Sequence, residues 1–391
     1  MTQQEKDALF LLLRYAMGII DSIPEEEKEN IKNSIPVLFE QSKSHDLAHM
    51  VAYALFENEL ISSDNPYFEK FKKRQIAALV RETRMSISLA EIASAFEKAG
   101  IAFIPLKGSV LRDYYPEKWM RTSADIDILV KKSDLQRALT LLIDEYGYTY
   151  MSKYIHDVSL SSRNGVHIEV HYSLIEESAA NDSSAVIETV WDNVELKEGY
   201  SYWYEMKDEY FYLYHIAHAA KHFLSGGCGI KSFLDLWILV NKMSYDAKKR
   251  KALIQKANLS SYDKMSCELA SVWFDGKEID KEEIRLMQNF IITGGVYGTP
   301  LNHMAMQQQK RGGKLGYVKE LFFPSFDYMS RRYPVLEKHK WMLPFVHIYR
   351  SVSAIFRGSM PRIMKMLKVN SETPKEIDEA MVYLLKKTGL N

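Results

Sequence analysis

The sequence predicts an α+β protein, in which a small mixed β-sheet is embedded in a largely α-helical chain. Residues 1–99 carry apolar side chains at helical spacing, residues 101–172 switch to the alternation of short strands, and helical spacing returns from about residue 205. At 391 residues, the chain has room for two or three domains. We expect a helical region over residues 1–84, the sheet-bearing core over residues 85–200 and a second helical region over residues 201–391.

Two helices are expected before the sheet. Leu47–Leu60 has helical apolar spacing, and the polar cluster with Pro66 that follows it ends the helix. Ile76–Gly100 repeats the same spacing, and Gly100 stands where a helix would stop.

The first expected strands are Ile101–Leu106 and Ala124–Val130. The former is a short apolar run that leads into a turn at Gly108. In the latter, the apolar residues alternate with polar ones, so that Asp125 and Asp127 share one face of the strand.

A helix over Ser133–Tyr146 and a β-hairpin should follow. Val158–Ser162 and Val166–Tyr172 flank an Asn-Gly pair at residues 164–165, which is the strongest short hairpin signal. Three polar residues of the second hairpin strand share one face: His167, Glu169 and His171.

Helices are expected from there to the end of the chain, beginning with Tyr210–Leu224 and Ile230–Lys242. Between residues 331 and 368 there are nine Lys or Arg residues against one acid, Glu337, and aromatic residues interleave with them. This segment suits peripheral contact with an anionic substrate or an anionic membrane surface, and a solvated helix face over a packed core is the other interpretation.

Composition narrows the classes of function. With 51 basic and 51 acidic residues the formal charge is zero, which argues against a long nucleic acid as partner. Two cysteines, Cys228 and Cys267, cannot form a disulfide framework, and a reducing compartment fits them best. The sequence suggests neither a targeting signal nor a transmembrane segment, so a cytoplasmic location is expected.

Carboxylate side chains are the candidate functional groups that the sequence pattern predicts. Asp125 and Asp127 converge on one region, where a hard cation such as Mg²⁺ would relieve their repulsion. Such a pair alone is more often a solvated strand face. Here the Gly108-Ser109 turn at a strand-to-helix junction suits a phosphate, and Glu169 adds a third carboxylate, so the three features together indicate phosphoryl transfer.

These residues resemble the nucleotidyltransferase superfamily related to DNA polymerase beta. The chain is most similar to its bacterial branch of largely uncharacterised nucleotidyltransferases, with the strongest similarity over residues 76–240. The wider similarity rests on Ile104–Gly108, Tyr115-Pro116, Arg121, Asp125–Val130, Glu169–His171, His218, Lys221, His222, Asp235, Phe323-Pro324 and Arg332–Pro334.

The resemblance implies a polymerase beta-like core that transfers a nucleoside monophosphate from an NTP to a hydroxyl of a small molecule, a carbohydrate or a protein, releasing pyrophosphate. Asp125, Asp127 and Glu169 would be the catalytic residues and would hold two Mg²⁺ ions, with Glu169 as metal ligand or as general base. The nucleotide would be bound by Lys107, Gly108, Ser109 and Lys221.

Two other functions remain open at this point. A non-catalytic nucleotide-binding protein could keep the same fold. A metal-dependent glycosyltransferase could use Asp125-Ile126-Asp127, but it predicts alternating strands and helices ahead of the aspartates, whereas helices precede them here. Arg121 could be a structural ion-pair partner, and His218 with His222 fits packing or substrate contact better than a metal pair.

Overall fold

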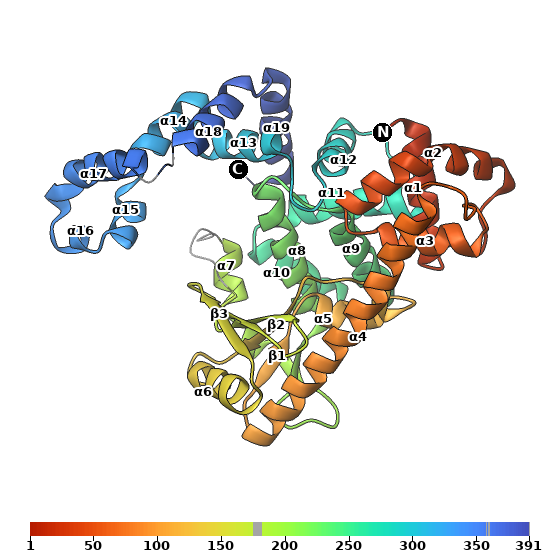
Figure 1. Cartoon of the computed structure of the whole chain (residues 1–391), viewed down its shortest axis with the longest axis horizontal. Helices are drawn as coiled ribbons and strands as arrows, with labels where there is room; N and C mark the ends of the chain where they lie inside the picture. Colours follow the sequence, from red (N-terminus) through yellow and green to blue (C-terminus); the bar gives the residue numbers. More distant parts are fainter. Residues whose placement is uncertain (175–181, 357, 359, 391) are drawn as a thin grey trace.

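The computed structural model describes residues 1–174, 182–356, 358 and 360–390 (Figure 1). It confirms the α+β class, because helices dominate and one five-stranded and one two-stranded sheet lie between them. In the described part of the chain, no helix is both long and apolar enough to cross a membrane.

Four helices precede the sheet. The first begins with a capping box between Thr2 and Glu5, and the last ends at Gly100, whose φ of 66° is the left-handed cap that glycine favours. The fourth helix runs without a break through residues 84 and 85, where a regional boundary was expected. The helices are α1 (Gln3–Ala16), α2 (Glu25–Ser44), α3 (Ala48–Glu57) and α4 (Phe68–Ala99).

The five-stranded sheet has the order β1-β2-β5-β4-β3. Strands β2 and β5 are parallel neighbours, and the other pairs are antiparallel. The expected hairpin is confirmed, since β4 and β5 pair across the Asn-Gly turn. The strands are β1 (Phe103–Pro105), β2 (Asp125–Val130), β3 (Thr149–Lys153), β4 (Asp157–Ser161) and β5 (His167–His171).

Short helices connect these strands. Helix α5 (Gly108–Leu111) follows β1 directly, and α6 (Leu135–Thr140) follows β2. The expected helix over residues 133–146 is therefore shorter, and it continues as a wider π turn over Leu141–Glu145. One-turn 3₁₀ helices cover Arg112–Tyr114, Lys118–Met120, Val190–Asp192 and Lys340–Met342, and a second π turn covers Ser271–Asp275.

Apolar residues of β2 and β5 pack on one side of the sheet against α4, which runs along it in Figure 1. Ile126 and Ile168 are fully buried there beside Phe96. Since side chains alternate along a strand, the polar residues of the same strands face the other side, toward α8.

Among the described residues outside the five-stranded sheet, one small hairpin accompanies the helices. A second, larger core joins the N-terminal helices to those that follow the sheet. The elements are α7 (Asp182–Ile187), β6 (Val194–Leu196), β7 (Tyr204–Met206), α8 (Asp208–Leu224), α9 (Ile230–Lys242), α10 (Ala247–Lys256), α11 (Ser260–Ala270), α12 (Glu282–Gly294), α13 (Pro300–Lys310), α14 (Gly313–Phe322), α15 (Phe326–Arg332), α16 (Val335–Lys338), α17 (Leu343–Phe356), α18 (Met360–Glu372) and α19 (Lys375–Thr388).

Candidate active site

The polar faces of β2 and β5 line one cavity of about 590 Å³, which α8 closes on the other side. The parallel register sets Asp127 beside Glu169, and Asp125 lies two residues earlier on the same face of β2. All three expected carboxylates therefore line the same cavity. The volume of this cavity is typical of sites that bind small molecules.

Asp127 is the buried centre of this cavity. Its Oδ1 accepts hydrogen bonds from Lys107 Nζ at 3.0 Å and from His171 Nε2 at 2.9 Å. Burial alone would raise the pKa of Asp127, but the two cations outweigh it and hold that pKa well below its usual range. Asp127 is therefore ionised at neutral pH.

His171 is the second cation that contacts Asp127. Burial would lower its pKa, but its hydrogen bonds to Asp127 and Glu169 raise the pKa to about 9, so the ring is an imidazolium at neutral pH. The distance from its Nε2 to Glu169 Oε2 is 3.4 Å. On the other side of Glu169, the Nε2 atom of His167 lies 3.5 Å from Oε1.

Asp125 has a different electrostatic environment from Asp127. Burial and the neighbouring Asp127 raise its pKa to about 6, although Lys107 acts in the opposite direction. A carboxylate whose pKa is raised by a like charge is one that a bound cation would stabilise in its ionised form.

The donor atoms around Asp127 fit a divalent cation. One atom each from Asp127, Glu169 and His171 lies within 4.8 Å of the others, and Asp125 lines the same cavity. Carboxylate oxygens are the ligands of hard cations such as Mg²⁺. His171 Nε2 could coordinate a metal only after losing the proton that it donates to Asp127.

A neighbouring group comprises His156, Asp157 and His171. His156 Nε2 lies 2.9 Å from Asp157 Oδ2, and its ring stacks on His171. Asp157 Oδ1 is buried without a hydrogen-bond partner among the described residues. Sequence analysis missed this pair; its one signal was an acid at the start of a buried strand.

Lys107 has an unusual backbone conformation. Its φ is +47° and its ψ is −119°, a combination of backbone angles that residues other than glycine rarely adopt. Such strain is of order 1–3 kcal/mol and persists where the surrounding structure enforces it. Here it accompanies the Lys107–Asp127 ion pair between the end of β1 and β2.

Gly108 begins α5 and lines the carboxylate cavity. A Cβ atom on Gly108 would lie 2.0 Å from Ser123 Oγ, so a larger residue here would need the Ser123 hydroxyl to rotate away or the loop before β2 to shift. Sequence analysis had explained the glycine by access for a phosphate; in the structure, Ser123 fills the space beside its Cα.

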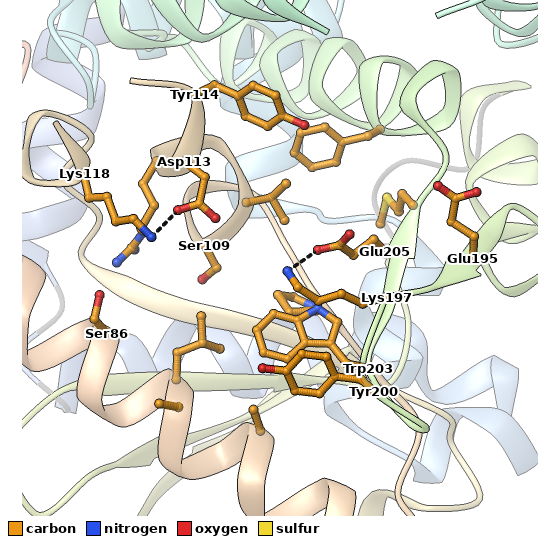
Figure 2. A pocket seen from close by; sticks show the side chains of 18 of the residues that line it. Ser86, Ser109, Asp113, Tyr114, Lys118, Glu195, Lys197, Tyr200, Trp203 and Glu205 are labelled. Carbon is orange, nitrogen blue, oxygen red and sulfur yellow. Dashed lines mark hydrogen bonds and ion pairs between the residues drawn. The ribbon is translucent and has the colours of Figure 1, made fainter. Parts of the chain in front are cut away.

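Ser109 lies elsewhere. It lines a separate cavity of about 740 Å³, between Ser86 of α4 and Trp203, and not the carboxylate cavity (Figure 2). Its Oγ is buried and has no hydrogen-bond partner among the described residues. Successive residues of a helix are rotated by about 100° about its axis, and Gly108 and Ser109 line different cavities.

Helix α8 brings Lys221, His218 and His222 to the carboxylate cavity. The two histidine Nε2 atoms are 3.1 Å apart. Burial and the charge of Lys107 lower the pKa of His218 well below its usual value, so that ring is neutral.

A smaller cavity of about 250 Å³ adjoins the carboxylate cavity. The two have six lining residues in common: Lys107, His156, His171, Tyr214, His218 and Lys221. Its remaining wall is largely apolar and includes Ile187, Ala217, Leu224 and Leu259.

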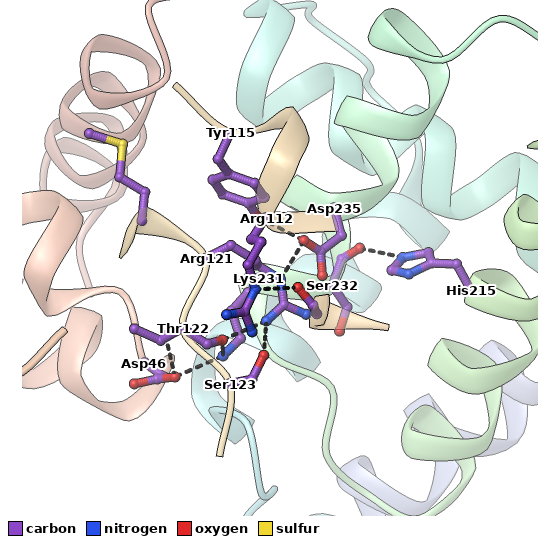
Figure 3. Close-up of polar contacts among 12 residues, drawn as sticks. Asp46, Arg112, Tyr115, Arg121, Thr122, Ser123, His215, Lys231, Ser232 and Asp235 are labelled. Atoms are coloured by element: carbon purple, nitrogen blue, oxygen red, sulfur yellow. Dashed lines mark hydrogen bonds and ion pairs between the residues drawn. The ribbon is translucent and has the colours of Figure 1, made fainter. Parts of the chain in front are cut away.

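Arg121 belongs to a buried polar network behind the loop that leads into β2 (Figure 3). Its Nε donates to Asp235 Oδ1 at 2.7 Å, and the Tyr115 hydroxyl donates to the same oxygen at 2.7 Å. Lys231 of α9 pairs with Asp46 at 2.7 Å. The network fixes this loop to α9 and to the N-terminal helices, so Arg121 is a structural ion-pair partner as well as part of the cavity wall.

Comparison with known proteins identifies a family for this chain. No curated protein matches the sequence. Residues 32–275, well over half of the chain, match a family described as uncharacterised nucleotidyltransferase. The matched segment runs from α2 to the turn after α11, and it contains every residue along the wall of the carboxylate cavity except Val296. The chain therefore belongs to this family of uncharacterised nucleotidyltransferases.

Proposed function

We propose that the protein transfers a nucleoside monophosphate from an NTP to an acceptor hydroxyl and releases pyrophosphate. The observation that carries the proposal is the cavity in which Asp125, Asp127 and Glu169 lie beside Lys107, in a chain that belongs to a nucleotidyltransferase family. Phosphoryl transfer requires mainly positioning and charge neutralisation, and this cavity provides groups for both.

We propose that Asp125, Asp127 and Glu169 hold two Mg²⁺ ions. Carboxylate oxygens of Asp127 and Glu169 lie within 4.8 Å of each other, close enough to share one ion, which supports this assignment. When bound, such ions neutralise the charge on the phosphates and lower the pKa of the attacking hydroxyl.

The triphosphate would lie along the cationic side of the cavity. Lys107 and His171 are cations that already contact Asp127, and Lys221 lines the same wall. We assign phosphate binding to Lys107, Lys221 and the backbone at Gly108. The hydroxyl of Ser109 is not included, because it faces the other cavity.

The acceptor would enter through the adjoining 250 Å³ cavity. This cavity meets the carboxylate cavity at Lys107 and His171, and the rest of its wall is largely apolar. An acceptor with a partly apolar body could therefore bind there while its hydroxyl reaches the carboxylates.

Labelling with each radioactive NTP tests the proposal. The wild-type protein, Mg²⁺ and a cell extract are incubated with one α-labelled NTP at a time, and Asp125→Asn/Asp127→Asn is the matched inactive variant. We expect the wild type alone to label an acceptor and to release pyrophosphate. Lys118→Ala, which removes an exposed lysine paired with Asp113, serves as the active control.

Two outcomes contradict transfer. If the wild type binds an NTP with Mg²⁺ but labels nothing beyond the double variant, the non-catalytic alternative is correct. If it also binds no NTP, the assignment of the cavity fails.

A further inference from the structure

An apolar stripe on α17 and on the 3₁₀ turn before it faces solvent. We define it as Trp341, Phe345, Ile348, Tyr349, Val352 and Phe356, whose exposed fractions run from 46% to 86%. From Phe345 onward the residues recur at spacings of three and four, so they lie on one face of the helix. Exposed apolar patches of this kind mark binding surfaces.

The opposite face of α17 is already occupied. Val346 is buried with Met329 and Leu336 in a small cluster of its own. Arg350 Nη1 donates to the carbonyl of Leu321 at 3.1 Å, which attaches α17 to the end of α14. These contacts fix the rotation of the helix and turn the stripe outward.

The stripe belongs to an arm, which we define as α14 to α17. Figure 1 shows the arm extending from the helical body, with α15, α16 and α17 at the end remote from it. Among the described residues, none of the arm lines the carboxylate cavity, so membrane binding by the arm and catalysis at the cavity can be tested independently.

Basic residues flank the stripe. Lys338 and Lys340 immediately precede it and are exposed. Helix α18, which follows, exposes Arg362, Lys365 and Lys368. Over residues 331–368 there are nine bases and one acid, although the whole chain is neutral.

We propose that the arm binds the surface of a membrane that contains anionic lipids. The stripe would enter the interface between headgroups and acyl chains, and the flanking bases would contact the headgroups. Its Trp, Tyr and Phe side chains are those that favour this interface. The charge excess disfavours a second copy of the chain as occupant, because two such segments would place nine bases against nine.

Vesicle sedimentation with the full chain tests the proposal. We expect the wild type to bind vesicles of phosphatidylcholine and phosphatidylglycerol at a 3:1 ratio and to bind pure phosphatidylcholine weakly. Phe345→Ser/Ile348→Ser should reduce the partition coefficient at least about ten-fold. Lys338→Ala/Lys340→Ala should reduce it about ten-fold or more at low salt, since each base near an anionic surface contributes about a five-fold factor.

Ile87→Ser is the matched control, because Ile87 is 58% exposed on α4, far along the chain from the arm. It should bind like the wild type, and all variants should melt at the wild-type temperature. Three results overturn the proposal: no wild-type binding to anionic vesicles, equal binding of the stripe variant, or equal binding to both vesicle types. A wild-type dimer in light scattering that Phe345→Ser/Ile348→Ser dissociates also overturns it, because the stripe then contacts a second copy.

Discussion

Lys107 combines a strained backbone with a buried ion pair, and the two can be separated by substitution. Both Lys107→Ala and Lys107→Gly remove the contact to Asp127, so each should lower kcat/KM at least about 100-fold. Glycine accepts a φ of +47° without strain, so Lys107→Gly should be more stable than Lys107→Ala by about 1 kcal/mol in urea unfolding. Equal stabilities of the two variants would contradict the strain.

The substitution Glu169→Gln distinguishes between the two possible roles of Glu169, as a metal ligand or as a general base. Its carboxylate lies among the donor atoms around Asp127, so we expect a ligand. The Mg²⁺ concentration for half-maximal activity should then rise at least about ten-fold. A general base would instead leave that concentration unchanged and lower only kcat. His339→Gln, on an exposed histidine of the arm, should change neither quantity.

At the scale of elements, α5 and the loop before β2 must fit together at Gly108. Gly108→Ala would place a Cβ against Ser123 Oγ, and we expect the clash to displace Ser123 and the loop that leads to Asp125. We expect a loss of about 1–3 kcal/mol in unfolding free energy and a lower turnover. Gly108→Ala/Ser123→Ala removes the clashing oxygen and should recover most of both. A double variant no better than Gly108→Ala would show that another contact requires the glycine.

Helix α8 provides a test of the acceptor cavity. Ala217 lines only the smaller of the two adjoining cavities, and Ala217→Phe would fill much of its 250 Å³. Transfer to the acceptor should fall at least about ten-fold, whereas the Kd for the NTP stays within about two-fold of the wild type. A matching rise in the NTP Kd would instead place the nucleotide in this cavity.

The strands show which features a sequence predicts and why. The faces of β2 and β5 were predictable because each alternates between buried apolar and polar residues, and the Asn-Gly turn identified the β4–β5 hairpin. Strand β3 was missed because it is an edge strand with mostly exposed side chains, including Tyr150, and so lacks an apolar face. The periodicity of the sequence does not indicate which strands are neighbours, so the pairing of β2 with β5 could not be predicted from it. The contact of His171 with Asp127 is therefore known only from the structure.

The site shows the same limit. Its carboxylates follow from strand alternation, whereas the direction of Ser109 depends on how a single helical turn leaves β1. The histidine and acid at residues 156 and 157 carry no motif, because they approach His171 only through the pairing of β4 with β5.

At the scale of the molecule, the N-terminal helices are joined to the helices after the sheet by one continuous core. Polar contacts cross the same boundary. Ile230 N–H donates to His45 Nδ1 at 3.2 Å, and His45 Nε2 lies 3.2 Å from the carbonyl of Ile292, so a neutral ring bridges α9 and α12. The helical regions on either side of the sheet therefore form a common frame for the carboxylate cavity.

Buried histidines in this frame should make the fold sensitive to acid. Burial lowers the pKa of His45 and that of His49 to about 4, against about 6.5 in an unfolded chain. Between pH 6.5 and 4 the unfolded chain therefore binds protons that the folded chain does not, and the unfolding free energy falls as the pH is lowered. Each ring contributes up to about 1.4 kcal/mol per pH unit.

His49→Gln isolates one of these contributions, because the glutamine amide can still donate to the Met120 carbonyl that the ring contacts at 2.8 Å. Urea unfolding of this variant between pH 6.5 and 4.5 should show a slope against pH that is shallower by up to about 1.4 kcal/mol per unit. His339→Gln, at an exposed histidine, should keep the wild-type slope. An unchanged slope in His49→Gln would mean that His49 binds its proton equally well in the folded and the unfolded protein, and that acid loosens the frame through other groups.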